Sequence, residues 1–219
     1  MADYKKPDHW QLKARKEGYP ARSIYKLKEI DEKFSILKPP RTFSLKVLDL
    51  GAAPGSWSLY VLRKMSGSAS QKRGFLAAAD LSPLSADFDS ELKKCAFTNN
   101  DSSINGNFFF IQGDITDPQV RETLLSKGPY TTIISDAAPA TTGNHTVDSA
   151  RSLALAEEVI SYAEALVPGG NLAVKVFQGG DSAALLKHMK TLFQTAKSFK
   201  PQACRGESVE TYYIGLGKK

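Results

Sequence analysis

Short apolar runs alternate with amphipathic segments from Val47 to the end of the chain. Because the apolar runs are nearly continuous, they suit strands that are covered on both faces, as in a parallel sheet. Helical periodicity fills residues 149–166, before Pro168-Gly169-Gly170, and residues 181–195. This alternation predicts a doubly wound α/β fold. The expected strands are residues 45–50, 75–80, 108–112, 131–135, 171–177 and 211–216.

Residues 1–45 differ from the rest, and we expect them to form a mostly helical arm. Between Pro20 and Phe34, apolar positions recur with the period of an amphipathic helix. Pro39-Pro40 then separates the arm from a domain of residues 46–219. The expected buried face of the arm helix carries Ile24, Leu27 and Ile30, and Lys26, Lys28 and Glu29 surround it.

Composition adds one feature, a basic arm on a neutral body. The 219 residues are 42% hydrophobic and 24% charged, as in ordinary globular proteins. Residues 1–46 hold 12 of the 29 basic residues but 6 of the 23 acidic ones, so the net charge of +6 lies in this segment. This asymmetry favours an acidic polymer such as nucleic acid as the partner, although a solvated charged helix gives the same count.

Several classes of protein are disfavoured by what the sequence lacks. No apolar run approaches the roughly 18 residues of a membrane span, and the N-terminus has no apolar signal core. Cys95 and Cys204 have no CxxC spacing, and His9, His145 and His188 have no metal-ligand spacing. We therefore expect a cytoplasmic protein without a metal or a disulfide, and nothing in the sequence demands more than a monomer. The polar stretch 82–107 is expected to be a helix followed by a surface loop.

The first predicted strand runs into a glycine turn with the sequence DLGAAPGSW, residues 49–57. A strand, a glycine turn and a helix start allow a ligand to approach the backbone closely. The turn lacks the GxGxxG pattern, which argues against a dinucleotide.

Carboxylates lie at the ends of four predicted strands, at Asp49, Asp80, Asp114 and Asp136. Ligands of open α/β sheets bind at the carboxyl ends of the strands, near the point where the strand order reverses. Asp80 is placed to accept hydrogen bonds from a ribose, and Asp114 from an adenine amino group. Each aspartate alone could be a helix cap, but four of them beside a glycine turn favour a ligand site.

The sequence contains four motifs, LDLGAAPGSW, SDAAP, LAVKVFQGGD and SVETYY, and the arm contains ARSIYKLKEID. Together these motifs resemble those of the FtsJ/RrmJ family of RNA ribose 2′-O-methyltransferases. The resemblance covers about residues 10–217. It implies a Rossmann-like fold with a seven-stranded, mostly parallel sheet, helices on both faces, and S-adenosylmethionine as cofactor. The compact bacterial members look most similar; they methylate an A-loop uridine of 23S rRNA, so 23S rRNA or the large ribosomal subunit is the implied partner.

The resemblance also implies a set of site residues. The family's Lys-Asp-Lys-Glu catalytic set falls, residue by residue, on Lys26, Asp136, Lys175 and Glu210. The expected cofactor site combines the glycine turn with the strand ends and consists of Asp49, Gly51, Pro54, Gly55, Trp57, Asp80, Asp114 and Asp136.

The chemistry explains why such residues are needed. A ribose 2′-hydroxyl must lose its proton as it displaces a methyl group from a sulfonium. A lysine accepts that proton only as the neutral amine, a form that burial or a neighbouring cation favours. We interpret Lys175 as the base, Lys26 as the cation, Asp136 as the group that orients Lys175, and Glu210 as the group that positions Lys26 or the ribose. A structural ion pair is the alternative for Lys175.

We expect the arm to bind RNA phosphates through Lys13, Arg15, Lys16, Arg22 and Lys28. Trp10 and Tyr25 either stack on bases or pack in the core, and His145 either lies in an exposed loop or contacts the substrate. Three other functions stay open: the same chemistry on tRNA, a catalytically silent RNA-binding assembly factor, and a nicotinamide oxidoreductase. The complete catalytic set argues against the second of these, and the absent GxGxxG pattern against the third.

Overall fold

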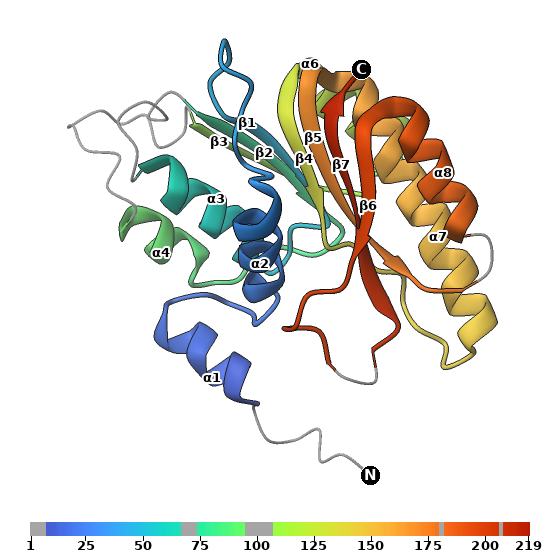
Figure 1. Cartoon of the computed structure of the whole chain (residues 1–219). Coiled ribbons are helices and arrows are strands. Elements are labelled where there is room, and N and C mark those ends of the chain that lie inside the picture. Colours follow the sequence, from blue (N-terminus) through green and yellow to red (C-terminus); the bar gives the residue numbers. More distant parts are fainter. Residues whose placement is uncertain (1–7, 67–73, 95–106, 180–181, 206–207) are drawn as a thin grey trace.

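A computed structural model describes residues 8–66, 74–94, 107–179, 182–205 and 208–219. Its centre is one seven-stranded sheet with the strand order β3-β2-β1-β4-β5-β7-β6 (Figure 1). The first five strands pair in parallel, whereas β7 is antiparallel to both β5 and β6. The strands are β1 (Lys46–Leu50), β2 (Phe75–Asp80), β3 (Phe108–Gln112), β4 (Tyr130–Ser135), β5 (Leu166–Phe177), β6 (Phe193–Phe199) and β7 (Glu210–Lys218).

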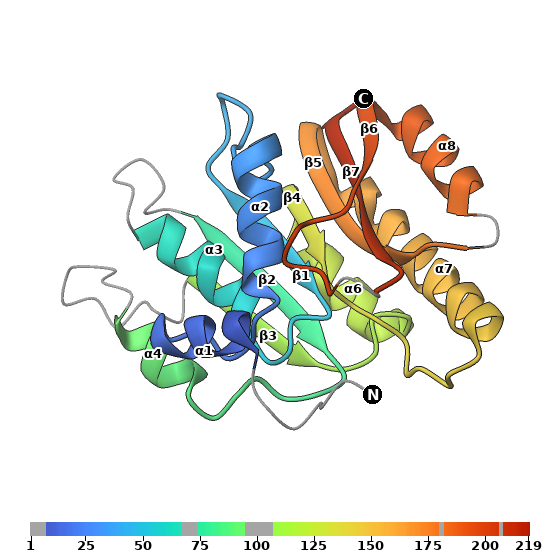
Figure 2. The ribbon, with the colours of Figure 1, turned by 60° about the horizontal axis from the view of Figure 1, so that its bottom comes forward.

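Helices cover both faces of the sheet (Figure 2). Apolar residues of α1 to α4 share one core cluster with one sheet face, and those of α6 to α8 share another cluster with the opposite face. This double coverage explains why the strands are so uniformly apolar. The helices are α1 (His9–Lys16), α2 (Ile24–Phe34), α3 (Ser56–Ser66), α4 (Phe88–Lys94), α6 (Pro118–Ser126), α7 (His145–Ser161), the 3-10 helix η1 (Tyr162–Ala165) and α8 (Ser182–Leu192).

The predicted α/β class is confirmed, but two segments were assigned wrongly. The helix expected over 181–195 ends at Leu192, and the chain then forms β6, a strand that the hydrophobic pattern did not predict. As an edge strand, β6 alternates only loosely between buried and exposed positions, so its pattern continues that of α8. Pro168-Gly169-Gly170, expected to follow the helix as a stop signal, lies inside β5, where the pairing with β4 shifts register.

The arm helix packs on the sheet through its predicted apolar face. Ile24, Leu27 and Ile30 of α2 are fully buried in a cluster that also holds residues of β1, β5 and β7. Lys26 was expected among the exposed charges around this face, yet it is buried. Helix α4 confirms the helical half of the 82–107 prediction, and residues 95–106 of its expected loop lie outside the described residues.

The strand order places the carboxyl ends of β1 and β4 side by side at the point where the order reverses. In open α/β sheets this crevice is where ligands bind. The loops that leave β1, β2, β4 and β5 gather there, on the lower side of Figure 1, and α1 lies below them. Across the described part of the chain, no helix combines the length and apolar character needed to cross a bilayer.

Candidate active site

Four charged side chains from distant parts of the chain meet at this edge of the sheet. Lys26 of α2 lies 2.9 Å from Glu210 at the start of β7 and 3.8 Å from Asp136, which follows β4. Lys175 of β5 lies 3.1 Å from the same Asp136 carboxylate, and its Nζ also donates to the Asp136 carbonyl oxygen at 2.5 Å. The structure therefore brings together all four residues of the predicted catalytic set.

The sheet register explains this meeting. In the antiparallel pair β5–β7, Lys175 lies opposite Tyr212, and Phe177 lies opposite Glu210. Cross-strand neighbours point to the same face, and residues two apart on a strand share that face as well. Lys175 and Glu210 therefore face the side of the sheet on which α2 packs, and α2 delivers Lys26 to them.

Burial makes this cluster electrostatically strong, since its four side chains are only 9–16% exposed. Burial alone lowers the pKa of Lys26, but the carboxylates of Asp136 and Glu210 outweigh it and hold that pKa above its ordinary value. Burial raises the pKa of Asp136, but the ammonium groups of Lys175 and Lys26 reverse the effect and bring it below its ordinary value. Lys26 is therefore an ammonium and Asp136 a carboxylate at neutral pH.

Tyr212 belongs to this site, although it is not one of the predicted site residues. Its hydroxyl donates to Asp136 Oδ1 at 2.5 Å. Burial and the Asp136 carboxylate raise the pKa of Tyr212 well above its ordinary value, so the hydroxyl keeps its proton. Glu210 directly precedes the predicted strand 211–216, and the spacing of two residues between Glu210 and Tyr212 was the available signal, because in an extended chain it places both on the same face.

Cys204 lies near the same cluster. Burial, followed by the carboxylate of Glu210, raises the pKa of the Cys204 thiol to about 12. The thiol is therefore protonated and unreactive as a nucleophile at neutral pH.

A second group of predicted residues lines a pocket at the ends of β1, β2, β3 and β4. Gly51, Asp80 and Asp114 lie on its wall, together with Leu81, Gly113, Ile115, Ala137, Ala138 and Leu155. Gly51 has φ +80°, and a Cβ there would lie 2.5 Å from the Cβ of Ala137, so only glycine fits. Leu81 is 68% exposed, which leaves an apolar surface open beside the two carboxylates.

The two pocket carboxylates are held in place by their own loops. Asp80 accepts hydrogen bonds from the backbone N–H groups of Ala53 and Ser82, and Asp114 accepts from the N–H and hydroxyl of Thr116. Each carboxylate retains further lone pairs for a ligand. Carboxylates beside an apolar wall suit the hydroxyls and the ring of an adenosine, so the residues present fit the nucleoside part of S-adenosylmethionine.

Trp57 and Gly55, two further predicted cofactor residues, do not line this pocket. Trp57 is buried, and its indole N–H donates to the carbonyl of Ser23 at 2.9 Å. Gly55 has φ +108°, and a Cβ there would lie 2.5 Å from the Phe88 ring. Both residues therefore fix the glycine turn against the arm and α4.

Asp49 is fully buried, and Ser58 donates to it at 2.7 Å. Burial raises the pKa of Asp49 to about 7. Its second carboxylate oxygen has no hydrogen-bond partner within the described part of the chain. Asp49 therefore ties β1 to α3 and does not line the strand-end pocket.

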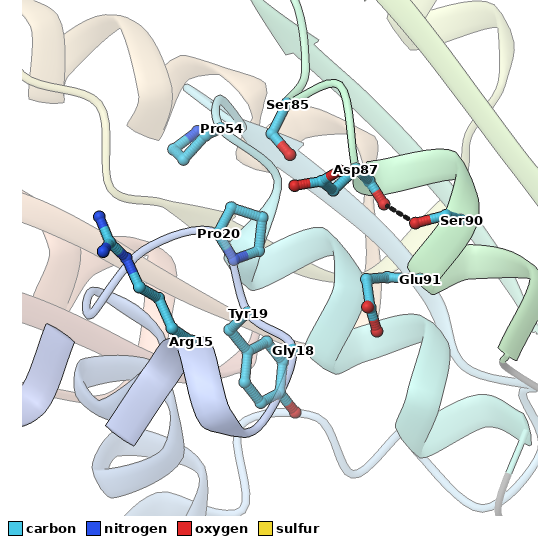
Figure 3. Close-up of a pocket in the computed structure, with 9 residues that line it drawn as sticks. All are labelled: Arg15, Gly18, Tyr19, Pro20, Pro54, Ser85, Asp87, Ser90 and Glu91. Atoms are coloured by element: carbon cyan, nitrogen blue, oxygen red, sulfur yellow. Dashed lines mark hydrogen bonds between the residues drawn. The ribbon is translucent and has the colours of Figure 1, made fainter. Parts of the chain in front are cut away.

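Pro54 lines a different and larger hollow, of about 560 Å³, between the arm and the segment that follows β2 (Figure 3). Figure 3 shows Arg15 entering from α1, and Ser85, Asp87, Ser90 and Glu91 on the opposite side. Arg15 is exposed here, close to the glycine turn.

The structure divides the five predicted RNA-binding cations into two groups. Arg22 pairs with Asp8 and donates to the carbonyl of Ala203, and Lys28 pairs with Glu17 at 2.7 Å, so both hold the arm together. The exposed cations on α1 are Lys13, Arg15 and Lys16.

The two aromatic candidates of the arm pack against each other. Tyr25 is buried, and the Trp10 ring lies 4.9 Å from it, which favours the core-packing interpretation of both. Among the described residues, no three His, Cys, Asp or Glu side chains are grouped so that they could hold a metal ion.

The glycine turn, the strand-end carboxylates and a seven-stranded sheet with an antiparallel β7 define a Rossmann-like methyltransferase fold. Solved structures agree. A Plasmodium falciparum protein titled a ribosomal RNA methyltransferase superposes with a TM-score of 0.68 at 24% identity, covering 91% of this chain and 98% of that one. A Listeria monocytogenes protein titled a class I S-adenosylmethionine-dependent methyltransferase gives a TM-score of 0.57 at 11% identity, covering 98% of this chain and 64% of that one.

Within this class, the chain belongs to the FtsJ-like methyltransferase family, whose sequence profile matches residues 19–218. A Treponema denticola protein named ribosomal RNA large subunit methyltransferase E is 48% identical over 99% of this chain and 97% of its own length. A protein of the same name from Oleidesulfovibrio alaskensis is 44% identical over 97% and 92%. The resemblance inferred from the motifs is confirmed.

Proposed function

We propose that this chain transfers a methyl group from S-adenosylmethionine to the 2′-hydroxyl of a ribose in 23S rRNA, at a uridine of the A-loop in the large ribosomal subunit. The observation that carries the proposal is the buried cluster of Lys26, Asp136, Lys175 and Glu210 close to the strand-end pocket. The names of the relatives support large-subunit rRNA as the substrate. The chain would act as a monomer, because a single chain supplies all four side chains. It would act in the cytoplasm.

The pocket residues would hold the cofactor. When bound, S-adenosylmethionine supplies a methyl group that is made electrophilic by its sulfonium. Asp80 would accept hydrogen bonds from the ribose hydroxyls, and Asp114 from the adenine amino group. Because glycine has no side chain, Gly51 lets the turn pack close to Ala137, the residue after Asp136.

Lys175 would accept the proton of the ribose hydroxyl as the new bond forms. Its two contacts with Asp136 fix the position of Nζ, and the Asp136 carboxylate at 3.1 Å stabilises the ammonium that results. Lys26 and the Tyr212 hydroxyl contact the same Asp136 carboxylate and hold it in position beside Lys175.

Glu210 would hold Lys26 in place, because both of its carboxylate oxygens lie 2.9 Å from Lys26 Nζ. Lys13, Arg15 and Lys16 would bind RNA phosphates without reading the sequence.

The test is a methyl-transfer assay with mapping of the product. The purified chain is given tritiated S-adenosylmethionine with large ribosomal subunits from a strain that lacks the enzyme, or with bare tRNA. We expect label in the subunits, and digestion of the rRNA to nucleosides should yield one 2′-O-methyluridine. Label in tRNA alone would support the tRNA alternative, and no transfer to either RNA would favour a silent assembly factor.

A further inference from the structure

An open pocket of about 330 Å³ lies beside the catalytic cluster and is used by none of the steps above. It shares one residue, Glu210, with that cluster. Its volume lies at the lower end of the range of ligand sites, about 300–1,000 Å³. Four segments line the pocket: the loop after β4, the start of α7, the end of β5 and the start of β7. The lining residues are Thr141, Gly143, His145, Asp148, Ser149, Phe177, Ser208, Val209 and Glu210.

The register of β5 and β7 fixes the relation of this pocket to the proposed base. Phe177 lies two residues beyond Lys175 on β5, on the same face, and it pairs with Glu210 just as Lys175 pairs with Tyr212. Two residues along a strand span roughly 6.5 Å. The aromatic wall of the pocket therefore begins about one nucleoside's width from the amine that would act on the ribose.

The lining suits a neutral, planar and polar ligand. Phe177 and Val209 supply apolar surface, and His145 and several hydroxyls supply hydrogen-bonding groups. No lysine or arginine is among the described lining residues, and the nearby Lys200 ammonium is engaged by the Ser208 carbonyl oxygen at 2.7 Å. A nucleobase has the matching chemistry, with apolar faces and polar edges.

The two acidic residues of the lining are already engaged. Asp148 accepts hydrogen bonds from Thr142 and from the N–H of Gly143, and Glu210 is held by Lys26. Neither carboxylate is therefore an isolated charge that would require a cationic ligand.

The rim of the pocket is closely packed at one point. Gly179 has φ +144°, and a Cβ there would lie 2.9 Å from the Ser149 hydroxyl and 3.2 Å from the His145 ring. Asn144 caps α7 by accepting from the N–H groups of Thr146 and Val147. His145, the first residue of α7, is thus presented from a fixed helix end.

We infer that this pocket holds the base of the nucleotide whose ribose is methylated, an inference that rests on the proposed function. The base would leave its stack in the RNA, as bases do when an enzyme acts on a nucleotide that is otherwise enclosed. Phe177 would contact the face of the base and His145 its polar edge. The ribose would then lie at Lys175, and the phosphates would stay outside this pocket, whose described lining includes no lysine or arginine.

The test compares a normal target nucleotide with an abasic one. Once the methylated nucleotide is mapped, large subunits are reconstituted with 23S rRNA that carries either this nucleotide or a ribose without a base at the same position. The native chain, Phe177→Ala and His145→Ala are assayed on both substrates. Val147→Ala is the matched control, because Val147 is exposed on the same turn of α7 but does not line the pocket.

On the normal substrate, we expect each pocket variant to lower kcat/KM about tenfold or more, as for the loss of a base-stacking contact. On the abasic substrate, the native chain should be slowed, and the pocket variants should be no slower than the native chain. An equal loss on both substrates, or no loss on either, would overturn the inference. The His145 variant keeps the test decisive if Phe177→Ala does not fold.

Failure of the proposed function gives a different result. In that case the native chain places no methyl group on any ribose of the normal substrate. If only the pocket inference is wrong, the native chain still produces the 2′-O-methyl nucleotide.

Discussion

Replacing Lys175 with alanine removes the proposed base and also one of the cations that pair with Asp136. Asp136 keeps the Tyr212 hydroxyl at 2.5 Å and Lys26 at 3.8 Å, so its charge is not left isolated. We therefore expect the free energy of unfolding to fall by about 1.5–3 kcal/mol, the cost of losing a hydrogen bond to a charged group. An orphaned buried charge would cost about 3–5 kcal/mol.

The effect on catalysis should be larger than the effect on stability. A positioned general base contributes about 10²- to 10⁴-fold to a rate, or about 3–5 kcal/mol at about 1.4 kcal/mol per factor of ten. Lys175→Ala should lose that much in kcat. Lys175→Arg should lose as much, because a guanidinium keeps the positive charge but cannot accept the proton.

The assay is single-turnover transfer of a tritiated methyl group to large subunits that lack the modification, with cofactor binding measured by calorimetry. Both variants should bind S-adenosylmethionine as the native chain does, since Lys175 does not line the strand-end pocket. Lys197→Ala, at an exposed position of the edge strand β6, is the matched control. A folded Lys175→Ala chain with transfer within tenfold of native would refute the assignment of Lys175 as the base.

Four further outcomes test other parts of the site. Tyr212→Phe removes the hydroxyl that donates to Asp136, so urea titration should show a loss of about 1.5–3 kcal/mol, with slower methyl transfer but unchanged cofactor affinity. Burial raises the pKa of Asp49 to about 7, so between about pH 4 and pH 7 the folded chain binds a proton that the unfolded chain has lost. The free energy of unfolding should therefore fall as the pH rises through this window, by about 1.4 kcal/mol per pH unit. In Asp49→Asn that slope should disappear from urea titrations made across the window, and an unchanged slope would contradict the assignment. Asp80→Ala should weaken S-adenosylmethionine binding about tenfold or more in calorimetry, whereas an unchanged affinity would remove Asp80 from the cofactor site. Truncation of residues 1–18 should weaken RNA binding in filter-binding assays and make it less dependent on salt, while the affinity for the cofactor stays the same. An unchanged RNA affinity would mean that this part of the arm does not contact RNA.

The sequence by itself determined the α/β class, the glycine turn and the acidic strand ends, because these depend on local patterns. Apolar runs mark strands buried on both faces, and a turn that needs positive φ selects glycine, as at Gly51. The motifs also singled out Lys26, Asp136, Lys175 and Glu210, but only through resemblance to a family. Nothing in their spacing along the chain shows that they meet.

Only the tertiary structure decided which of these residues touch one another. Lys26 and Glu210 are 184 positions apart and come within 2.9 Å because α2 packs on the face to which the β5–β7 register turns Glu210. The same register added Tyr212 to the catalytic cluster and placed Phe177 beside it. The strand β6 escaped prediction because an exposed edge strand needs little apolar alternation, whereas a buried strand shows its environment in every residue. Local patterns record how deeply each segment is buried, but the contacts of a site depend on strand register and helix packing, which the chain fixes only when distant segments come together.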